Sequence, residues 1–503
     1  MDPSPEPIRS QLMTTKVLRP DGCVMPDGNR CSACTEDIAL EKQLKELENL
    51  TEKIHIRRRA LRTVMNQNHD RLIHRFPPEI ASRIFFYYSL ASSCLDTYEK
   101  TNTLCLGAVC RKWRQLAWTT PEVWTWIHIH NRIIYRWNNN AAKLLAEWLE
   151  RSATLPLTIR FLGPSNGHSA VYCVVTDLLN KHSARWYDLE LDIPARHFHL
   201  LGGSSQQNIL HKLVIFPNIS SNEALSTFRM ACSPIELGLM YWSLKYVDIL
   251  WNNLTVVHLA SLALDEFFEA LRRPPHLVTI TLLRIEPLSG NFDVPNTRIS
   301  CPHVRSLELR YIESEVLGKI LNLVCLPSLE QWTLRRCAFP LNTMISFIGS
   351  SSFGLKIFRI IGDRDIPDRI HDLLRRLPSI EVLQLGFMSE DKPPTEILFF
   401  ELLCSPSEPA FLPHLQMLKF DHDLLVPLES LPRIFSASHR QSLRLEVDYH
   451  NIVGIEDETA ARFLELVDEG FNLRVLGDRE ADMIEEYKVN RHSQREQGSI
   501  TQE

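Results

Sequence analysis

The sequence lacks a long hydrophobic run. Its N-terminus, MDPSPEPIRSQLMTTK, has no apolar core of a secretory signal, and its longest apolar stretch, IFFYYSLASSCL, is too short to span a membrane. A strong charge of either sign is also lacking: the formal net charge is −6, with 55 Lys and Arg mixed among 61 Asp and Glu. No broad basic face for nucleic acid is therefore expected. These absences predict an intracellular chain, in the cytoplasm or the nucleus, that binds protein and neither membrane nor nucleic acid.

Motifs for enzyme chemistry are scarce as well. The chain has no glycine loop for phosphate and no H-E-x-x-H pair for a metal. GPSNG at residues 163–167 matches G-x-S-x-G between a predicted strand and a predicted helix, which would make Ser165 a hydrolase nucleophile. The same cluster of Gly, Pro, Ser and Asn is typical of an ordinary strand-to-helix loop, and the surrounding pattern is not that of a hydrolase sheet. We therefore expect no enzymatic activity.

Three of the twelve cysteines lie near one another in the sequence, at Cys23, Cys31 and Cys34. Their spacing, C-x7-C-x2-C, invites a zinc ion. A closed structural zinc site needs four ligands, and no His and no further Cys precedes His55. The sequence therefore predicts reduced thiols in a disordered segment, with no metal and no cofactor.

Two other polar features have ordinary explanations. His128 and His130 alternate with Ile127 and Ile129, which places both histidines on one side of a strand. Histidines on an exposed face are expected there and not a metal pair. The basic run HIRRR at 55–59 would suit a nuclear address or a phosphate patch, but it follows an acid-rich half-helix. A solvated helix face is expected.

The N-terminal segment divides into two parts. Residues 1–35 are rich in Pro, Ser, Gly and Asp and are expected to be disordered, as is the tail over 478–503. Residues 36–69 predict an amphipathic helix, because mostly apolar residues recur at alternating steps of four and three. These positions hold Leu40, Leu44, Leu47, Thr51, Ile54, Arg58, Leu61 and Met65. The stripe suits a coiled coil with another copy, docking on the following domain or a solvated helix; Arg58 within it argues against the coiled coil.

A short pattern recurs nine times from residue 186 onward. Positions 1, 4 and 6 of each copy are apolar, as in WYDLEL (186–191) and LVTITL (277–282), and helix-like stretches such as LDEFFEALRR separate the copies. The copies start at residues 186, 210, 254, 277, 304, 329, 355, 380 and 415. The longest step leaves room for a skipped copy near SPIELGLMY. The spacing predicts a leucine-rich-repeat-like α/β solenoid over 131–477, irregular because only Asn218 and Cys337 supply the usual Asn or Cys at position 9.

The segment HRFPPEIASRIFFYYS, residues 74–89, starts a helix with two prolines and covers it with apolar side chains. Proline is tolerated at the first helical position, because its missing N–H would have no partner there, and it keeps the preceding residue extended. The helix is therefore expected to begin near Pro78. Two apolar faces are expected on it: Ile80 and Ile84 with Tyr87 or Tyr88, and Ala81 and Phe85 with Phe86 or Tyr88. One face serves the chain's own core, and the other is exposed unless a partner covers it.

A second predicted helix, LGAVCRKWRQLA at 106–117, follows, and after it comes TPEVWTWIHI. PPEIASRIF followed by VCRKWRQLA resembles the F-box, a three-helix module with Leu-Pro-x-Glu-Ile, then Ile-Phe, then Val-Cys-[Arg/Lys]-x-Trp. TPEVWTWIHI and the WLERS and WNNLTVVHLAS stretches further on extend the resemblance, because together they are similar to stretches in the F-box proteins abundant in mushroom-forming fungi. Phe76 stands where leucine is usual, and CLDTYEKTNT lengthens the segment between the two signatures.

The resemblance implies an F-box domain over 70–130 whose helices interleave with a Skp-family adaptor and connect the chain to a cullin-RING ubiquitin ligase. Carried over by position, the expected adaptor contacts are Phe76, Pro77, Pro78, Glu79, Ile80, Ile84, Phe85, Val109, Cys110 and Trp113. A helical cap over the first repeat would also explain the apolar faces. It would not explain why the two signatures occur together.

The expected fold class is α+β: an N-terminal amphipathic helix and a helical F-box, then an irregular leucine-rich-repeat-like α/β solenoid. The expected function is that of a non-enzymatic adaptor, which holds an unknown substrate protein on the concave sheet of the solenoid for ubiquitylation. Polar repeat positions such as Glu308, Thr333, Arg359 and Gln384 would line that sheet. The alternative is a leucine-rich-repeat scaffold that binds a protein partner and has no ligase role.

Overall fold

The structure, a computed structural model, divides into two compact units, Met1–Val123 and Trp124–Glu503. It describes residues 23, 29–69, 75–94, 103–202, 209–218, 225–351, 353–362, 369–386, 397–405, 410–421, 428–448, 456–477 and 482–489. Residues 1–22 and most of the tail, which the composition predicts to be disordered, lie outside this set; within the tail, residues 483–489 form a helix, contrary to that prediction. Among the described helices, none combines the length and the apolar character that crossing a bilayer requires.

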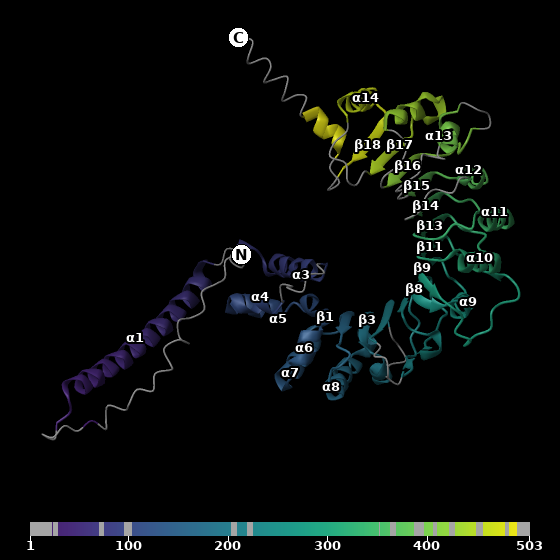
Figure 1. Ribbon diagram of the computed structural model, residues 1–503. Coiled ribbons are helices and arrows are strands. Elements are labelled where there is room, and N and C mark those ends of the chain that lie inside the picture. The colour runs from purple at the N-terminus through teal and green to yellow at the C-terminus, as the bar shows by residue number, and fades with distance from the viewer. Residues whose placement is uncertain are drawn as a thin grey trace, which may run out of the picture. The chain divides into compact units, whose positions relative to one another are not determined.

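The described part of the first unit is helical (Figure 1). Its elements are α1 (Ser32–His69), α3 (Pro78–Cys94), α4 (Leu104–Val109), α5 (Arg111–Trp118) and the 3-10 helix η3 (Pro121–Trp124), whose last residue opens the second unit. Helix α3 begins at Pro78, as the proline pattern predicts. Helix α1 begins at Ser32, earlier than the composition predicts. The backbone N–H and the hydroxyl of Thr35 both donate to the Cys31 carbonyl, each at 3.1 Å, and close the first turn.

The apolar stripe of α1 faces solvent. Each of five stripe residues is at least half exposed: Leu40, Leu44, Leu47, Ile54 and Leu61. The basic run also lies on this helix, and Arg59 reaches Glu52 at 3.8 Å with both side chains mostly exposed. Such exposed pairs contribute little to stability. The stripe is therefore accessible to a partner, whether a second copy or another domain.

The second unit contains a sheet of fourteen described strands, all parallel and all in chain order. They are β1 (Trp126–Ile129), β2 (Leu157–Leu162), β3 (Trp186–Pro194), β4 (Lys212–Asn218), β6 (Glu236–Met240), β8 (Val256–Ala263), β9 (Thr279–Glu286), β11 (Ser306–Arg310), β13 (Gln331–Arg335), β14 (Ile357–Ile361), β15 (Val382–Gly386), β16 (Met417–Asp421), β17 (Arg444–Asp448) and β18 (Asn472–Leu476). Two short strand pairs, β5 (Phe228–Arg229) with β7 (Val247–Asp248) and β10 (Ile299–Ser300) with β12 (Val324–Cys325), lie beside it.

Helices connect the strands of this sheet. They are α6 (Asn131–Tyr135), α7 (Asn139–Arg151), α8 (Ser169–Asn180), α9 (Leu264–Arg272), α10 (Ser314–Leu323), α11 (Leu341–Ser350), α12 (Ile370–Leu374), α13 (Ile397–Cys404) and α14 (Asp457–Asp468), with 3-10 turns η4 (Ser183–Arg185), η5 (Ala195–Leu200), η6 (Leu244–Tyr246), η7 (Leu428–Ser436) and η8 (Ser438–Arg440). Within this unit, strands β9 to β16 lie along the inner side of an arc and helices α10 to α13 along its outer side (Figure 1). The architecture is mixed α/β.

The core of this unit consists of repeated rows of apolar side chains. Position 4 of each copy pairs in register with position 4 of the next, and every member of the row is at most 4% exposed. The row is Ile127, Ile159, Leu189, Leu213, Leu237, Val257, Ile280, Leu307, Trp332, Phe358, Leu383, Leu418, Leu445 and Leu473. Burying one such side chain contributes about 1.5–3 kcal/mol. The strand units therefore stabilise one another through this row.

All nine predicted copies contain a strand, and the skipped copy is β6. Strands β1, β2, β17 and β18 lie outside the nine predicted copies. In β6, β17 and β18 the strand keeps its buried apolar pair but lacks the apolar residue at position 1, where Pro234, Ser442 and Gly470 stand. The three-position pattern therefore does not predict these three units.

The loop after β9 is held by a buried carboxylate. Asp265, at the start of α9, is fully buried and accepts the backbone N–H of Ser289 at 2.8 Å and those of Asn291 and Phe292 at 3.1 Å. The hydroxyl of Ser289 donates to it as well, at 2.7 Å. Burial alone would raise the pKa of Asp265, but these hydrogen bonds outweigh it, so the pKa lies below the ordinary value. The anionic carboxylate thus fixes this loop.

Candidate functional site

Helix α3 presents a row of large apolar side chains to solvent. Phe76, just before the helix, and Ile80, Ile84 and Tyr87 on it are 40–56% exposed. They are spaced by four, four and three residues, which places them on one face of the helix. This is the first of the two faces that the sequence predicts.

The adjacent face of α3 packs inside the unit. Ala81 and Phe85 are 1% exposed, and Ser89 continues the same face at 7%. The Phe85 ring lies 4.8 Å from the Trp113 ring of α5, centroid to centroid. Phe85 therefore belongs to the unit's own core and holds α5 against α3.

Residues 106–117, predicted to form one helix, form two. Cys110 has an extended backbone, with φ −157° and ψ 174°, and separates α4 from α5. Its sulfur accepts the Trp113 backbone N–H at 3.4 Å and caps α5. Arg114 donates to the Gly107 carbonyl at 2.7 Å, which ties the two helices together. Sequence periodicity alone does not reveal this break, because Cys is not a typical helix breaker.

The ten expected contact residues are thus distributed over three environments. Phe76, Pro77, Pro78, Glu79, Ile80, Ile84 and Val109 are exposed, Cys110 and Trp113 are half-buried, and Phe85 is buried. A hydrogen bond of 3.0 Å from Thr120 to Ser82 attaches the segment after α5 to α3. The predicted insertion between the signatures falls mostly at 95–102, outside the described residues. Six of the seven exposed residues lie on or just before α3, and Val109 lies on α4.

Residues 73–130 match the family model described as F-box-like. The chain therefore contains an F-box-like domain. Domains of this kind typically bind Skp-family adaptors in SCF complexes, and proteins that carry them are generally adaptors and not enzymes. No curated protein is significantly similar to the chain.

The F-box-like domain is followed by a second surface, on the sheet. Position 5 of each strand unit points away from the buried rows and forms its own in-register row, which contains the predicted polar residues Glu308, Thr333, Arg359 and Gln384. The complete row is His128, Arg160, Glu190, Val214, Gly238, His258, Thr281, Glu308, Thr333, Arg359, Gln384, Lys419, Glu446 and Arg474. His128 thus stands on this sheet face and is half-buried, whereas His130 lies just past β1 and precedes α6.

Charged side chains of both signs lie on this face, and several of them pair. Glu308 pairs with Arg310 at 2.8 Å and with Arg335 of the next strand at 3.2 Å. Near the other end of the sheet, Arg160 pairs with Glu190 at 2.7 Å. Cross-strand pairs of this kind hold side chains in place while leaving hydrogen-bonding capacity exposed.

A cluster of charged side chains lies on the C-terminal strands of the face. Lys419 lies 3.1 Å from Glu446, 3.4 Å from Asp421 and 3.7 Å from Asp448. Burial alone would lower the pKa of Lys419, but the three carboxylates outweigh it and raise the pKa. Arg444 supplies a second cation, 3.0 Å from Glu446. With Arg474 on the last strand, three carboxylates and three cations balance at this end of the face.

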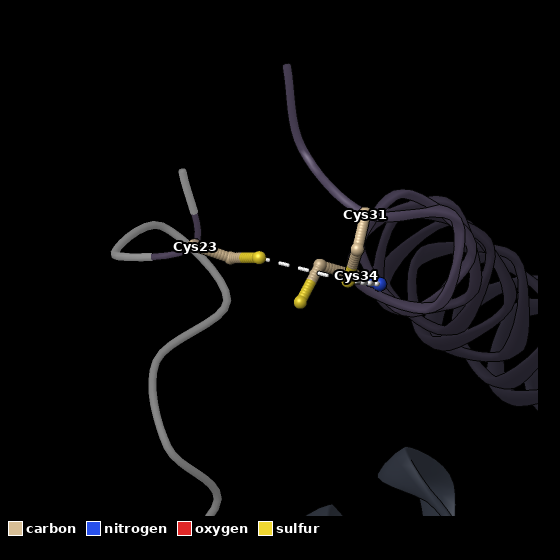
Figure 2. Close-up of side chains that lie close together, drawn as sticks. All are labelled: Cys23, Cys31 and Cys34. Atoms are coloured by element: carbon tan, nitrogen blue, oxygen red, sulfur yellow. Dashed lines mark hydrogen bonds between the residues drawn. The ribbon is translucent and has the colours of Figure 1, made fainter. Parts of the chain in front are cut away.

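The three N-terminal cysteines, predicted to be reduced thiols in a disordered segment, lie together (Figure 2). The sulfur of Cys23 is 3.6 Å from that of Cys31, and all three sulfurs lie within 4.8 Å of one another. The backbone N–H of Cys34 donates to the Cys31 sulfur at 3.4 Å and lowers the pKa of the Cys31 thiol. The hydrogen bond to Cys31 raises the pKa of the Cys34 thiol to about 12.

The loop that carries Ser165 is shaped by packing. The hydroxyl of Tyr172 on α8 donates to the Pro164 carbonyl at 2.7 Å. A Cβ atom at Gly163 would lie 2.5 Å from the Tyr172 oxygen, and one at Gly167 would lie 2.8 Å from its ring. Both glycines of the G-x-S-x-G match are therefore explained by the tyrosine that fills the loop, and the motif needs no nucleophile to account for it.

Proposed function

We propose that the chain is a substrate-recognition adaptor of an SCF-type cullin-RING ubiquitin ligase, acting in the cytoplasm or nucleus. The F-box-like domain binds a Skp-family adaptor, and the second unit binds a substrate protein. The chain itself makes and breaks no bond. Its contribution is proximity, which raises the effective concentration of substrate lysines near the charged ubiquitin carrier.

The observation that carries this proposal is the exposed apolar row on α3 within the F-box-like match. A contiguous row of exposed large apolar side chains on a small domain marks an interaction surface. Phe76, Ile80 and Ile84 are the proposed anchors, with Pro77, Pro78, Glu79 and Val109 around them. Phe85 is buried and Cys110 and Trp113 are half-buried, so these three residues support the surface by holding the helices in place.

For the substrate, we propose the in-register polar row of the large sheet, and we propose that residues 131–477 form a leucine-rich-repeat-like solenoid whose concave side this row lines. Parallel strand units in chain order and helices on the outer side of the arc support this view. The mixed charges suit a protein surface with complementary polar groups.

The test is reconstitution with the full-length chain. The chain should bind a purified Skp-family adaptor directly and should retain the cullin only when that adaptor is present. A chain that binds neither would contradict the ligase assignment. A chain that binds the cullin equally well without the adaptor would contradict the role of the F-box-like domain.

A protein-binding scaffold with no ligase role is the second candidate. The sheet face would serve it equally well, because nothing on that face depends on a ligase. The two candidates differ in one outcome of the reconstitution: a scaffold leaves the adaptor and the cullin unbound while partners captured by the sheet face remain.

A further inference from the structure

We propose that Cys23, Cys31 and Cys34 bind one zinc ion through three thiolates. The inference is independent of the ligase assignment, because none of these residues belongs to the F-box-like domain or the sheet. It rests on how the structure brings the three sulfurs together (Figure 2).

The separation of the sulfurs fits a shared metal. With zinc–sulfur bonds of about 2.3 Å, two thiolates of a tetrahedral site lie about 3.8 Å apart. The Cys23 and Cys31 sulfurs are 3.6 Å apart, and all three lie within 4.8 Å. A disulfide would require about 2.05 Å. The geometry is therefore close to that of metal ligands and far from that of a covalent bond.

The start of α1 favours thiolates at this point. Cys31 immediately precedes the helix, where the positive end of the helix dipole stabilises a thiolate on its sulfur, and Cys34 lies in the first turn. The Cys34 N–H already donates to the Cys31 sulfur at 3.4 Å. Cys31-x-x-Cys34 thus forms a local two-ligand unit, to which Cys23 adds the third sulfur.

Binding exchanges protons for the metal. Three thiols each release a proton to solvent, three Zn–S bonds form, and the site carries one net negative charge. Among the described residues no His, Asp, Glu or further Cys joins this group, and a tetrahedral site with three protein ligands keeps its fourth position for a non-thiolate ligand such as water. The ion would link Cys23 to the first turn of α1. A closed structural zinc site needs four protein ligands, but an open site needs only the three thiolates that these cysteines supply.

The test uses the full-length chain, reduced and stripped of metal with a chelator. Titration with Co²⁺ should give the intense visible absorption of a tetrahedral site and the near-ultraviolet charge-transfer absorption of thiolate ligands, saturating at one ion per chain. Zn²⁺ should abolish both. Cys31→Ser should lose the charge-transfer absorption, whereas Cys173→Ser, which removes an exposed thiol on α8, should keep it.

Alkylation of the wild-type chain gives a second readout that needs no variant. Zn²⁺ should protect Cys23, Cys31 and Cys34 from a thiol reagent, mapped by mass spectrometry, while Cys173 stays equally reactive with and without the metal. Equal alkylation of the three cysteines in both conditions would overturn the proposal. So would the absence of thiolate–cobalt absorption in the wild-type chain, or its persistence in Cys31→Ser.

Discussion

Replacing Ile84 by Asp tests the proposed adaptor surface most directly. Ile84 is 40% exposed in the chain alone, so a carboxylate at this position can stay hydrated and the helix should fold. In the complex the same carboxylate would be enclosed by apolar groups. Adaptor binding should therefore fall sharply while the unfolding of the free chain changes little.

The loss of binding free energy can be calculated from the exposed fraction of Ile84. Full burial of an isoleucine contributes about 1.5–3 kcal/mol, so covering the exposed 40% of Ile84 contributes roughly 0.6–1.2 kcal/mol. An unpaired carboxylate in the interface adds a desolvation cost of at least about 2 kcal/mol. The sum is about 3 kcal/mol, which corresponds to roughly a 100-fold increase in Kd.

The assay is a titration of the full-length chain with a purified Skp-family adaptor, with circular dichroism and thermal unfolding as folding controls. Val174→Asp is the matched control, because Val174 is a branched aliphatic residue that is 41% exposed on α8 in the other unit. It should leave the Kd unchanged. Wild-type affinity in Ile84→Asp, or an equal loss in Val174→Asp, would refute the assignment of the α3 surface.

Three further changes test the fold by denaturant unfolding. Phe85→Ala should lower the free energy of unfolding of the first unit by about 3–5 kcal/mol, because it leaves a cavity in the core. A decrease below about 1 kcal/mol would show that Phe85 is not a core residue. Gly163→Ala should cost roughly 1–3 kcal/mol through collision with Tyr172, and Gly202→Ala, which meets no atom within 4 Å, should cost much less. Asp265→Asn should lower the free energy of unfolding by about 2–3 kcal/mol at neutral pH. Because the folded pKa of Asp265 lies below its unfolded value, this difference should be complete above that unfolded value and shrink as pH falls through the folded pKa; a difference independent of pH would contradict the ionised state.

The alternating apolar pattern predicted the strands well, because two residues of every strand must be buried whatever the rest of the unit does. The two prolines predicted that α3 begins at Pro78, and helical spacing predicted that its apolar residues divide into two faces. Which face stays exposed could not be predicted, since the choice depends on where α5 packs. The Phe85–Trp113 contact decides it.

Other features depended on contacts that no periodic pattern encodes. The break at Cys110 arises from one sulfur that caps the next helix. The grouping of Cys23 with Cys31 and Cys34 joins a residue before α1 to its first turn, and the sequence spacing alone does not specify that approach. The expected adaptor contacts and domain limits remain predictions for the experiments above.

The shared register of the large sheet sets how this region can change during evolution. Duplication or loss of a whole strand-and-helix unit leaves every remaining pair aligned, so the length of the polar row can vary while its chemistry continues unbroken. Deletion of a single residue inside one strand instead turns its polar side chain inward and its apolar pair outward. Natural variation in this part of the molecule should therefore consist of gains and losses of entire units, together with point substitutions along the row that alter what it recognises.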